Sequence, residues 1–157
     1  MATKQQWGSI TWIMLHSLAE KIKDDDFEHE KDFLVGLLFK VCQVLPCPSC
    51  AAHCSHYISR LKTNKIVSKT DYIAYLNNFH NNVNARLNKP LMSISECRDK
   101  YKQARLIPVL NLFIRVFSMK DASQSLMMNN MHKMRFVAQF KKDIQNRIKY
   151  FDLTTSV

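Results

Sequence analysis

The sequence predicts an all-α protein. Of its 157 residues only 2 are glycine and 4 are proline, too few for the many tight turns of a β-rich domain. Apolar residues instead recur every three or four positions over long stretches, which is the spacing of one face of a helix. A chain of this length can bury a real core without disulfides or a metal as its main support.

Three helices are expected in the first part of the chain. Apolar stripes predict helices over residues 9–22 and 27–44, the second of which is stopped by Pro46. Pro48 lacks an amide hydrogen and suits the first turn of a helix, so a third helix should begin at Cys47 or Pro48 and run to about residue 62. The segment Cys-Pro-Ser-Cys therefore lies at a helix N-terminus.

A fourth helix should begin after residue 68. Ser68 and Asp71 have the spacing of a capping box, and the helix must end before Lys89-Pro90. Further along the chain we expect a short helix over residues 95–107, a strongly apolar segment over 109–119 and a long helix over 122–150. The long helix carries a Met-rich apolar stripe, which favours a core or a partner-facing surface over a cofactor site. Its members are Met127, Met131, Met134, Phe136, Val137, Phe140 and Ile144.

The charge balance does not identify a partner. A formal charge of +10 favours acidic proteins, nucleic acid or an anionic membrane surface. The basic residues are spread along the chain without a dense run, so we expect no specific nucleic-acid binding. No stretch approaches the roughly 18 apolar residues of a membrane span, and the polar start of the chain predicts no secretion signal.

The five cysteines are an odd set, which favours chemistry over a closed framework of disulfides. Cys47 and Cys50 have C-x-x-C spacing. A disulfide that closes so small a loop stabilises a fold little, so the pair suits redox cycling better than a structural role. The partial positive charge of a helix N-terminus stabilises a thiolate there. From these residues alone the prediction is a redox-capable dithiol.

Other interpretations of this segment remain open. Cys47, Cys50, His53 and Cys54 offer four zinc ligands, although they are crowded into one loop and one helical turn. A thioredoxin-like protein would need a βαβ context that the sequence does not supply. A third alternative is a non-catalytic helical module that binds other proteins through its basic surface.

Three separate segments together resemble the Erv/ALR family of FAD-linked sulfhydryl oxidases. They are Trp-x-x-Leu-His at residues 12–16 after Gly8, Pro-Cys-Pro-Ser-Cys at 46–50, and His-Asn-Asn-Val-Asn-Ala-Arg-Leu-Asn-Lys-Pro at 80–90. The last matches the family pattern H-N-x-V-N-x-x-L-x-K-P at every specified place. The resemblance covers residues 7 to 101 and is strongest to the oxidases of large cytoplasmic DNA viruses.

The resemblance implies a bundle of four helices plus a short fifth that holds FAD, commonly as a homodimer. On this basis residues 1–106 form the FAD-binding domain, and residues 107–157 form a helical extension packed on the bundle or at a dimer interface. Cys47 and Cys50 are the implied catalytic pair, and no metal is expected. The implied cofactor contacts are Gly8, Thr11, Trp12, His16, His53, His80, Asn81, Val83, Asn84, Lys89 and Tyr101.

The implied reaction is disulfide formation in protein thiols. Electrons pass from the substrate through Cys47 and Cys50 to FAD and then to O2, which gives hydrogen peroxide. The substrate is a thiol-containing protein or a small dithiol relay protein, because neither end of the sequence carries a shuttle pair of cysteines. A viral protein would act in the host cytoplasm or virion; the alternative is the mitochondrial intermembrane space.

Two departures from the family are visible. The cysteines that commonly join the third helix to the fourth are absent around residues 60–62 and 76–78, and Leu45 replaces the aromatic residue often found before the C-x-x-C proline. Cys42, Cys54 and Cys97 are not expected to act as a relay, because Cys42 and Cys54 belong to regular helices.

Overall fold

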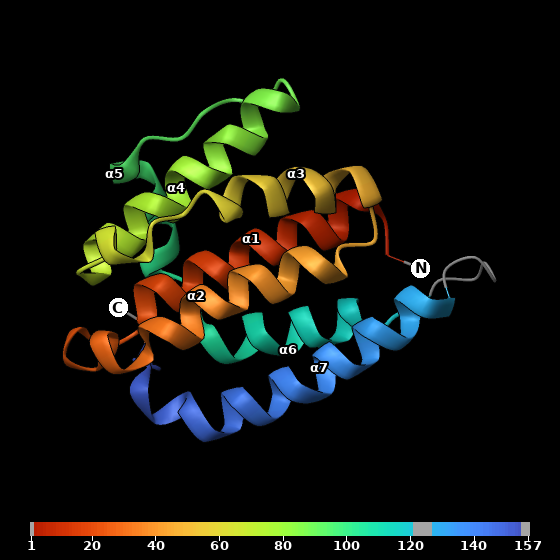
Figure 1. The fold of residues 1–157 in the computed structure, drawn as a ribbon. Helices are drawn as coiled ribbons and strands as arrows, with labels where there is room; N and C mark the ends of the chain where they lie inside the picture. Colours follow the sequence, from red (N-terminus) through yellow and green to blue (C-terminus); the bar gives the residue numbers. More distant parts are fainter. Residues whose placement is uncertain (1, 121–126, 155–157) are drawn as a thin grey trace.

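The structure is a computed structural model that describes residues 2–120 and 127–154, with side chains from residue 129 onward in the second segment. Within these residues the regular elements are helices and one isolated bridge (Figure 1). The helices are α1 (Lys4–Lys21), α2 (Phe27–Val44), α3 (Pro48–Ser59), α4 (Lys69–Arg86), α5 (Ile94–Lys102), α6 (Leu106–Phe117) and α7 (Met127–Arg147). The predicted all-α fold is confirmed.

Several helix ends differ from the sequence predictions. The first helix begins at Lys4 because Thr3 and Gln6 form a capping box, in which each side chain accepts a hydrogen bond from the other residue's amide. The short helix predicted to reach residue 107 ends at Lys102, and α6 begins four residues later. Residues 122–126 of the predicted long helix lie outside the described residues.

The helices form layers around α1 and α2. Helices α3, α4 and α5 lie on one side of this pair, and α6 and α7 lie on the other (Figure 1). On the first side, α2 packs on α3, while α1 packs on α4 and α5. On the second side, α6 packs along α1 and α7 along α2. Helix α1 is therefore covered from both sides.

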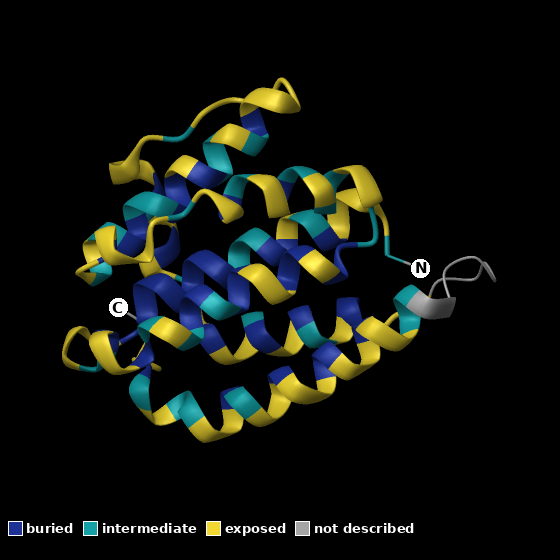
Figure 2. Ribbon diagram, in the orientation of Figure 1, coloured by how far each residue is buried: buried dark blue, intermediate teal, exposed yellow. Residues whose placement is uncertain are grey.

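The buried apolar residues of the described chain form one continuous core that includes α6 and α7. Figure 2 shows the buried positions concentrated on the faces that α1 and α2 turn toward their neighbours. In the extension, Phe113 lies edge-to-face against Phe140, with ring centroids 5.2 Å apart, and both rings are buried. The division at residue 106 stays a prediction about the organisation of the chain.

The predicted apolar stripe of α7 is buried over only part of its length. Met131 is 51% exposed and Met134 is 57% exposed, whereas the core positions are filled by Phe136, Val137 and Phe140. The Met127 side chain lies outside the described residues. The predicted stripe is therefore core at Phe136, Val137, Phe140 and Ile144, whereas Met131 and Met134 lie on the surface of this chain. In the described chain, no helix combines the length and apolar character needed to cross a bilayer.

The C-terminal segment is fastened to the first two helices by polar contacts. The fully buried carboxylate of Glu30 accepts a hydrogen bond from the Arg147 guanidinium at 2.7 Å and contacts His29 at 2.7 Å. Phe151 pairs with Ile22 in the isolated antiparallel bridge, next to the end of α1. A buried carboxylate needs such partners, because an unpaired buried charge is strongly unfavourable.

Arg147→Ala should lower the free energy of unfolding by about 1.5–3 kcal/mol, which is the usual contribution of a hydrogen bond to a charged group. Urea unfolding of this variant checks the value, with the exposed residue of the same helix, Arg135→Ala, as the control. Equal stability of the two variants would contradict the role of the Glu30 contact.

Candidate functional site

The C-x-x-C segment lies at the start of α3, as the sequence predicted. Cys47 is the N-cap residue, and its sulfur accepts a hydrogen bond from the Cys50 amide at 3.3 Å. Cys47 and Cys50 form a disulfide, with Cα atoms 5.2 Å apart. Both cysteines are half-buried, whereas Pro48 and Ser49 between them are exposed. The disulfide is thus at the surface and at the positive end of a helix dipole.

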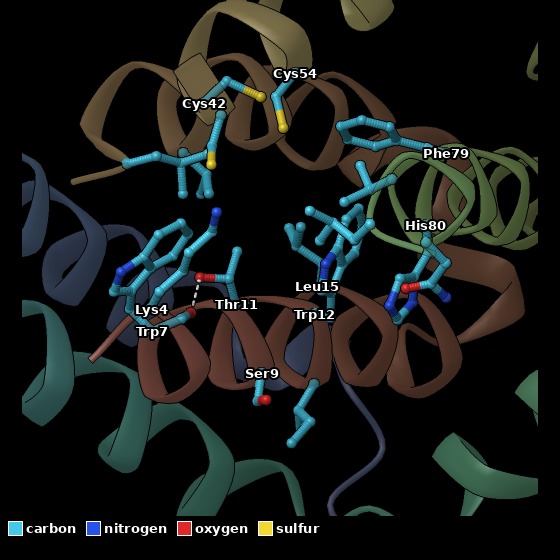
Figure 3. Close-up of a pocket in the computed structure, with 18 of the residues that line it drawn as sticks. Lys4, Trp7, Ser9, Thr11, Trp12, Leu15, Cys42, Cys54, Phe79 and His80 are labelled. Atoms are coloured by element: carbon cyan, nitrogen blue, oxygen red, sulfur yellow. Dashed lines mark hydrogen bonds between the residues drawn. The ribbon is translucent and has the colours of Figure 1, made fainter. Parts of the chain in front are cut away.

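A cavity of about 770 Å³ lies beside the disulfide, within the usual range of sites for small organic ligands. Helix α1 provides one long wall, with Trp7, Thr11, Trp12 and Leu15, and Cys42 and Cys54 face it from the opposite wall (Figure 3). Cys50 also lines the cavity. The redox pair therefore touches the cavity through its second sulfur.

Aromatic rings form the end of the cavity where α1 meets α4. The Trp12 indole stacks on the His80 imidazole, with centroids 4.1 Å apart and planes inclined by 8°. Phe79 meets Trp12 edge-on at 5.1 Å and stacks on Tyr57 of α3 at 4.7 Å. These contacts fix the position of Trp12 and His80 and leave flat apolar surface at the cavity, which suits a planar ligand.

A hydrogen-bonded chain runs behind these rings from α5 to the cavity. The Cys97 sulfur lies 3.5 Å from Nδ1 of His16, and Nε2 of His16 lies 3.0 Å from Nδ1 of His80. Burial raises the pKa of Cys97 to about 11, so the thiol stays protonated near neutral pH. In the tautomer in which this thiol donates to Nδ1 of His16, His16 donates from Nε2 and His80 carries its proton on Nε2.

The two hydrogen-bonded histidines, His16 and His80, are both held neutral. Burial, then the nearby His80 and Lys100, lower the pKa of His16 to about 3. Burial, then Lys100 and Lys89, lower the pKa of His80 to about 4. Since the ordinary histidine pKa is about 6.5, neither ring carries a charge near neutral pH. The site can therefore present a hydrogen-bond donor at His80 without a positive charge.

The residues Asn88, Lys89 and Pro90, which end the motif at residues 80–90, form the turn that terminates α4. Asn88 has φ 55°, in the left-handed region, and its amide donates to the Ala85 carbonyl at 3.2 Å. The Lys89 amide donates to the Asn84 carbonyl at 2.8 Å, which completes a Schellman end for α4. Asparagine tolerates this conformation, and Pro90 cannot continue the helix. This turn places Lys89 at the cavity wall.

Helix α5 is held against α1 by two polar contacts, and it brings a further aromatic residue to the site. The Lys21 ammonium donates to the Lys102 carbonyl at 2.6 Å, and the Arg98 guanidinium pairs with Glu20 at 3.1 Å. Tyr101 consequently stacks on His16, with centroids 4.4 Å apart and planes inclined by 7°. Lys100 and Tyr101 both line the cavity.

The structure brings most of the predicted cofactor contacts to this cavity. Those in its wall are Gly8, Thr11, Trp12, His80, Val83, Asn84, Lys89 and Tyr101. His16 lies behind His80, and Asn81 uses its amide group to hold the Met92 backbone at 2.8 and 2.9 Å. His53 is half-buried on α3 near Arg86, and burial and that guanidinium lower its pKa. The roles of all these residues stay predictions.

Several wall residues were not expected from the sequence, among them Lys4, Trp7, Phe79 and Lys100. Trp7 and Phe79 carry apolar patterns that look like ordinary core, and Lys4 and Lys100 look like ordinary surface. The Cys47, Cys50, His53 and Cys54 set does not form a metal site: the described residues contain no group of three or more histidine, cysteine or acidic side chains placed to hold an ion.

The comparisons with known proteins agree with this geometry. The model of the Erv1 / Alr family matches residues 9–106, which contain α2 to α5 and most of α1. The chain belongs to the Erv1/Alr family. A putative FAD-linked sulfhydryl oxidase of Invertebrate iridescent virus 3 is 31% identical over 97 residues, 61% of this chain and 66% of that protein.

Two further comparisons support membership and fold. The FAD-linked sulfhydryl oxidase of an African swine fever virus isolate (Tick/Malawi/Lil 20-1/1983) is 32% identical over 100 residues, 64% of this chain and 83% of that protein. The crystal structure of the yeast Erv1 core is 24% identical and has a TM-score of 0.58, over 65% of this chain and 86% of that one. The last likeness shows the shared fold of the bundle.

The neutral histidines predict a pH-dependent stability. In the unfolded chain His16 takes up a proton below about pH 6.5, but in the folded chain only near pH 3. The free energy of unfolding should therefore fall as the pH is lowered from 6.5 to 4.5, by up to about 1.4 kcal/mol per pH unit for this residue. His16→Phe, which keeps a ring against Tyr101, should flatten that slope in urea unfolding. The exposed His56→Phe is the control, and identical slopes for His16→Phe and the unsubstituted protein would contradict the assignment.

Proposed function

We propose that this Erv1/Alr-family protein is an FAD-dependent sulfhydryl oxidase that forms disulfide bonds in protein thiols. The observation that carries the proposal is the position of Cys50, which belongs to a surface disulfide and also lines an aromatic cavity. A redox pair with one side toward solvent and one toward a ligand cavity can accept electrons from a substrate thiol and pass them to a ligand bound in the cavity. The names of the viral relatives support the same activity.

The cavity has the chemistry that FAD requires. The Trp12 and His80 rings provide flat surfaces at the meeting of α1 and α4. Gly8 lines the wall, and a Cβ atom built there would meet nothing within 4 Å, so a ligand can approach the α1 backbone closely. Lys89 and Lys100 supply positive charge for a pyrophosphate. The residues present therefore fit this cofactor.

The proposed contacts follow from these positions. Gly8, Thr11, Trp12, Val83 and Asn84 would hold the ring system and its hydrogen-bonding edge, and Lys89 and Tyr101 would hold the phosphates and the adenine side. His80 would donate a hydrogen bond from Nε2, with His16 fixing its tautomer. Asn81 would act by securing the segment between α4 and α5, and His53 would contribute from α3. Bound FAD would accept two electrons and pass them to O2, which yields hydrogen peroxide.

The chain's own cysteines carry out thiol exchange. A substrate thiolate attacks the Cys47 sulfur, a mixed disulfide forms, and Cys50 leaves as a thiolate. A second substrate thiol attacks the mixed disulfide, which releases the oxidised substrate and reduced Cys47. The helix N-terminus stabilises the thiolates. The exposed Pro48 and Ser49 leave room for an extended substrate segment, and Arg86, which donates to the Ser49 carbonyl at 3.4 Å, would favour an acidic one.

The proposed partners are thiol-containing proteins or a small dithiol relay protein, with a second copy of this chain as a homodimer. The proposed setting is the host cytoplasm or the virion, which the organisms of the viral relatives support, and the alternative is the mitochondrial intermembrane space, which a fission-yeast relative named as mitochondrial supports. The rival functions are a non-catalytic interaction module and a zinc protein. A purified protein without flavin absorbance and without thiol-dependent oxygen consumption would favour a rival.

Cys47→Ser and Cys50→Ser should each abolish dithiothreitol-dependent oxygen consumption, by at least about 100-fold, because thiol exchange needs both sulfurs. Each variant should retain the visible flavin spectrum, because the pair transfers electrons without anchoring the cofactor. Ser55→Ala, an exposed change on the same helix, is the control. Activity in the Cys47→Ser variant would show that the redox pair is misassigned.

His80→Ala combined with Asn84→Ala should release FAD and remove its effect on stability. A ligand at a hundredfold excess over its dissociation constant stabilises the folded state by about 2.7 kcal/mol. The melting temperature of the unsubstituted protein should therefore rise when FAD is added, and that of the double variant should not. Asn78→Ala, at an exposed position of the same helix, is the control. A melting temperature that is insensitive to FAD in the unsubstituted protein would contradict the cofactor assignment.

A further inference from the structure

Two cysteines outside the C-x-x-C pair lie in the same cavity. Cys42 comes from α2 and Cys54 from α3, and both are buried. Both line the cavity that Cys50 lines, and Figure 3 shows them on the wall that faces α1. The proposed mechanism uses neither of them, so their position has no role in the activity described above.

These two thiols contact each other across the α2–α3 interface. Helix α3 packs on α2 and, over its described length, buries Cys54 and Ile58, so Cys54 lies within this interface. A hydrogen bond between Cys54 and Cys42 is the leading cause of a raised pKa at Cys42 and a lowered pKa at Cys54. A lowered pKa favours the thiolate form of Cys54.

Cys54 also lies next to the redox pair. It follows Cys50 by four residues on α3, and residues four apart on a helix lie on one face with Cβ atoms about 5–6 Å apart. The Arg86 charge also favours the Cys54 thiolate. A nucleophilic sulfur is therefore one helical turn from an electrophilic disulfide, and a second thiol is in contact with it.

We propose that Cys42 and Cys54 are a second, internal dithiol, which the Cys47–Cys50 disulfide oxidises to a disulfide that ties α2 to α3. This inference rests on the proposed function, which regenerates the Cys47–Cys50 disulfide after each transfer. The link would join the redox helix covalently to α2, the helix on which it packs. The thiols are an internal substrate of the enzyme's own active site.

The exchange balances without another oxidant. The Cys54 thiolate attacks the Cys50 sulfur; the Cys50–Cys54 bond forms, the Cys47–Cys50 bond breaks, and Cys47 leaves as a thiolate. Cys42, after losing its proton, attacks the Cys54 sulfur; the Cys42–Cys54 bond forms and Cys50 leaves as a thiolate. Two thiols have lost two electrons and two protons, and Cys47 and Cys50 have gained both.

Thiol mapping tests the proposal. Fully reduced protein with FAD is exposed to air, denatured in acid, alkylated with N-ethylmaleimide and digested for mass spectrometry without reduction. We expect a Cys42–Cys54 cross-linked peptide, with Cys97 alkylated as the internal control. In Cys50→Ser, treated identically, we expect Cys42 and Cys54 to be alkylated, because the attacked disulfide is missing.

A second arm separates this inference from the proposed function. Reduced protein is given one equivalent of diamide without oxygen, so that the accessible Cys47–Cys50 pair is oxidised chemically, and the link should then appear at Cys42–Cys54. Alkylated Cys42 and Cys54 in both arms would overturn the inference, even if the protein consumes oxygen with dithiothreitol. An equal yield of the link in Cys50→Ser would overturn the route through Cys50. The link in the diamide arm alone, without oxygen consumption, would support the exchange and reject the oxidase function.

Discussion

The stacking of Trp12 on His80 is the contact on which the site depends. It joins α1 to α4 at the cavity, and the rings on either side take their positions from it. Phe79 packs against the indole and also stacks on Tyr57 of α3. His16 is hydrogen-bonded to His80 and also stacks on Tyr101 of α5. Four helices are thereby held around one cavity by ring contacts, whose geometry is more specific than that of aliphatic packing.

Polar contacts at the helix ends complete this arrangement. The Asn88 turn directs Lys89 back toward the cavity, and Asn81 holds the segment that leads to α5. Lys21 and Glu20, at the end of α1, hold α5. Lys89 and Lys100 line the largely apolar cavity, and their charges add to the effect of burial in keeping the pKa of His80 low. This combination of flat rings, neutral donors and lysines is what a dinucleotide with a flavin ring requires.

Helix α3 packs on α2 and stacks Tyr57 on Phe79 of α4. Its N-terminus carries the disulfide, where access by another protein is needed, and its buried side chains are Cys54 and Ile58. On the far side of α1, helices α6 and α7 cover the bundle with an aromatic cluster, and Arg147 and Phe151 attach that layer to α2 and to the end of α1. The bundle is therefore rigid beneath the redox helix, and a covalent link between Cys42 and Cys54 would extend that rigidity to it.

The sequence by itself determined the helical class, the place of Cys47 and Cys50 at a helix start, and the family, because helical periodicity, proline and a motif of fixed spacing are local signals. It also predicted that Trp12 and His80 belong to one site, although the two residues lie 68 positions apart in separate motifs. Only the tertiary structure decided which part of the α7 stripe is buried, and that Cys42 and Cys54 line the same cavity. These outcomes depend on which helix faces come together, and the periodicity of a single helix does not specify its neighbour.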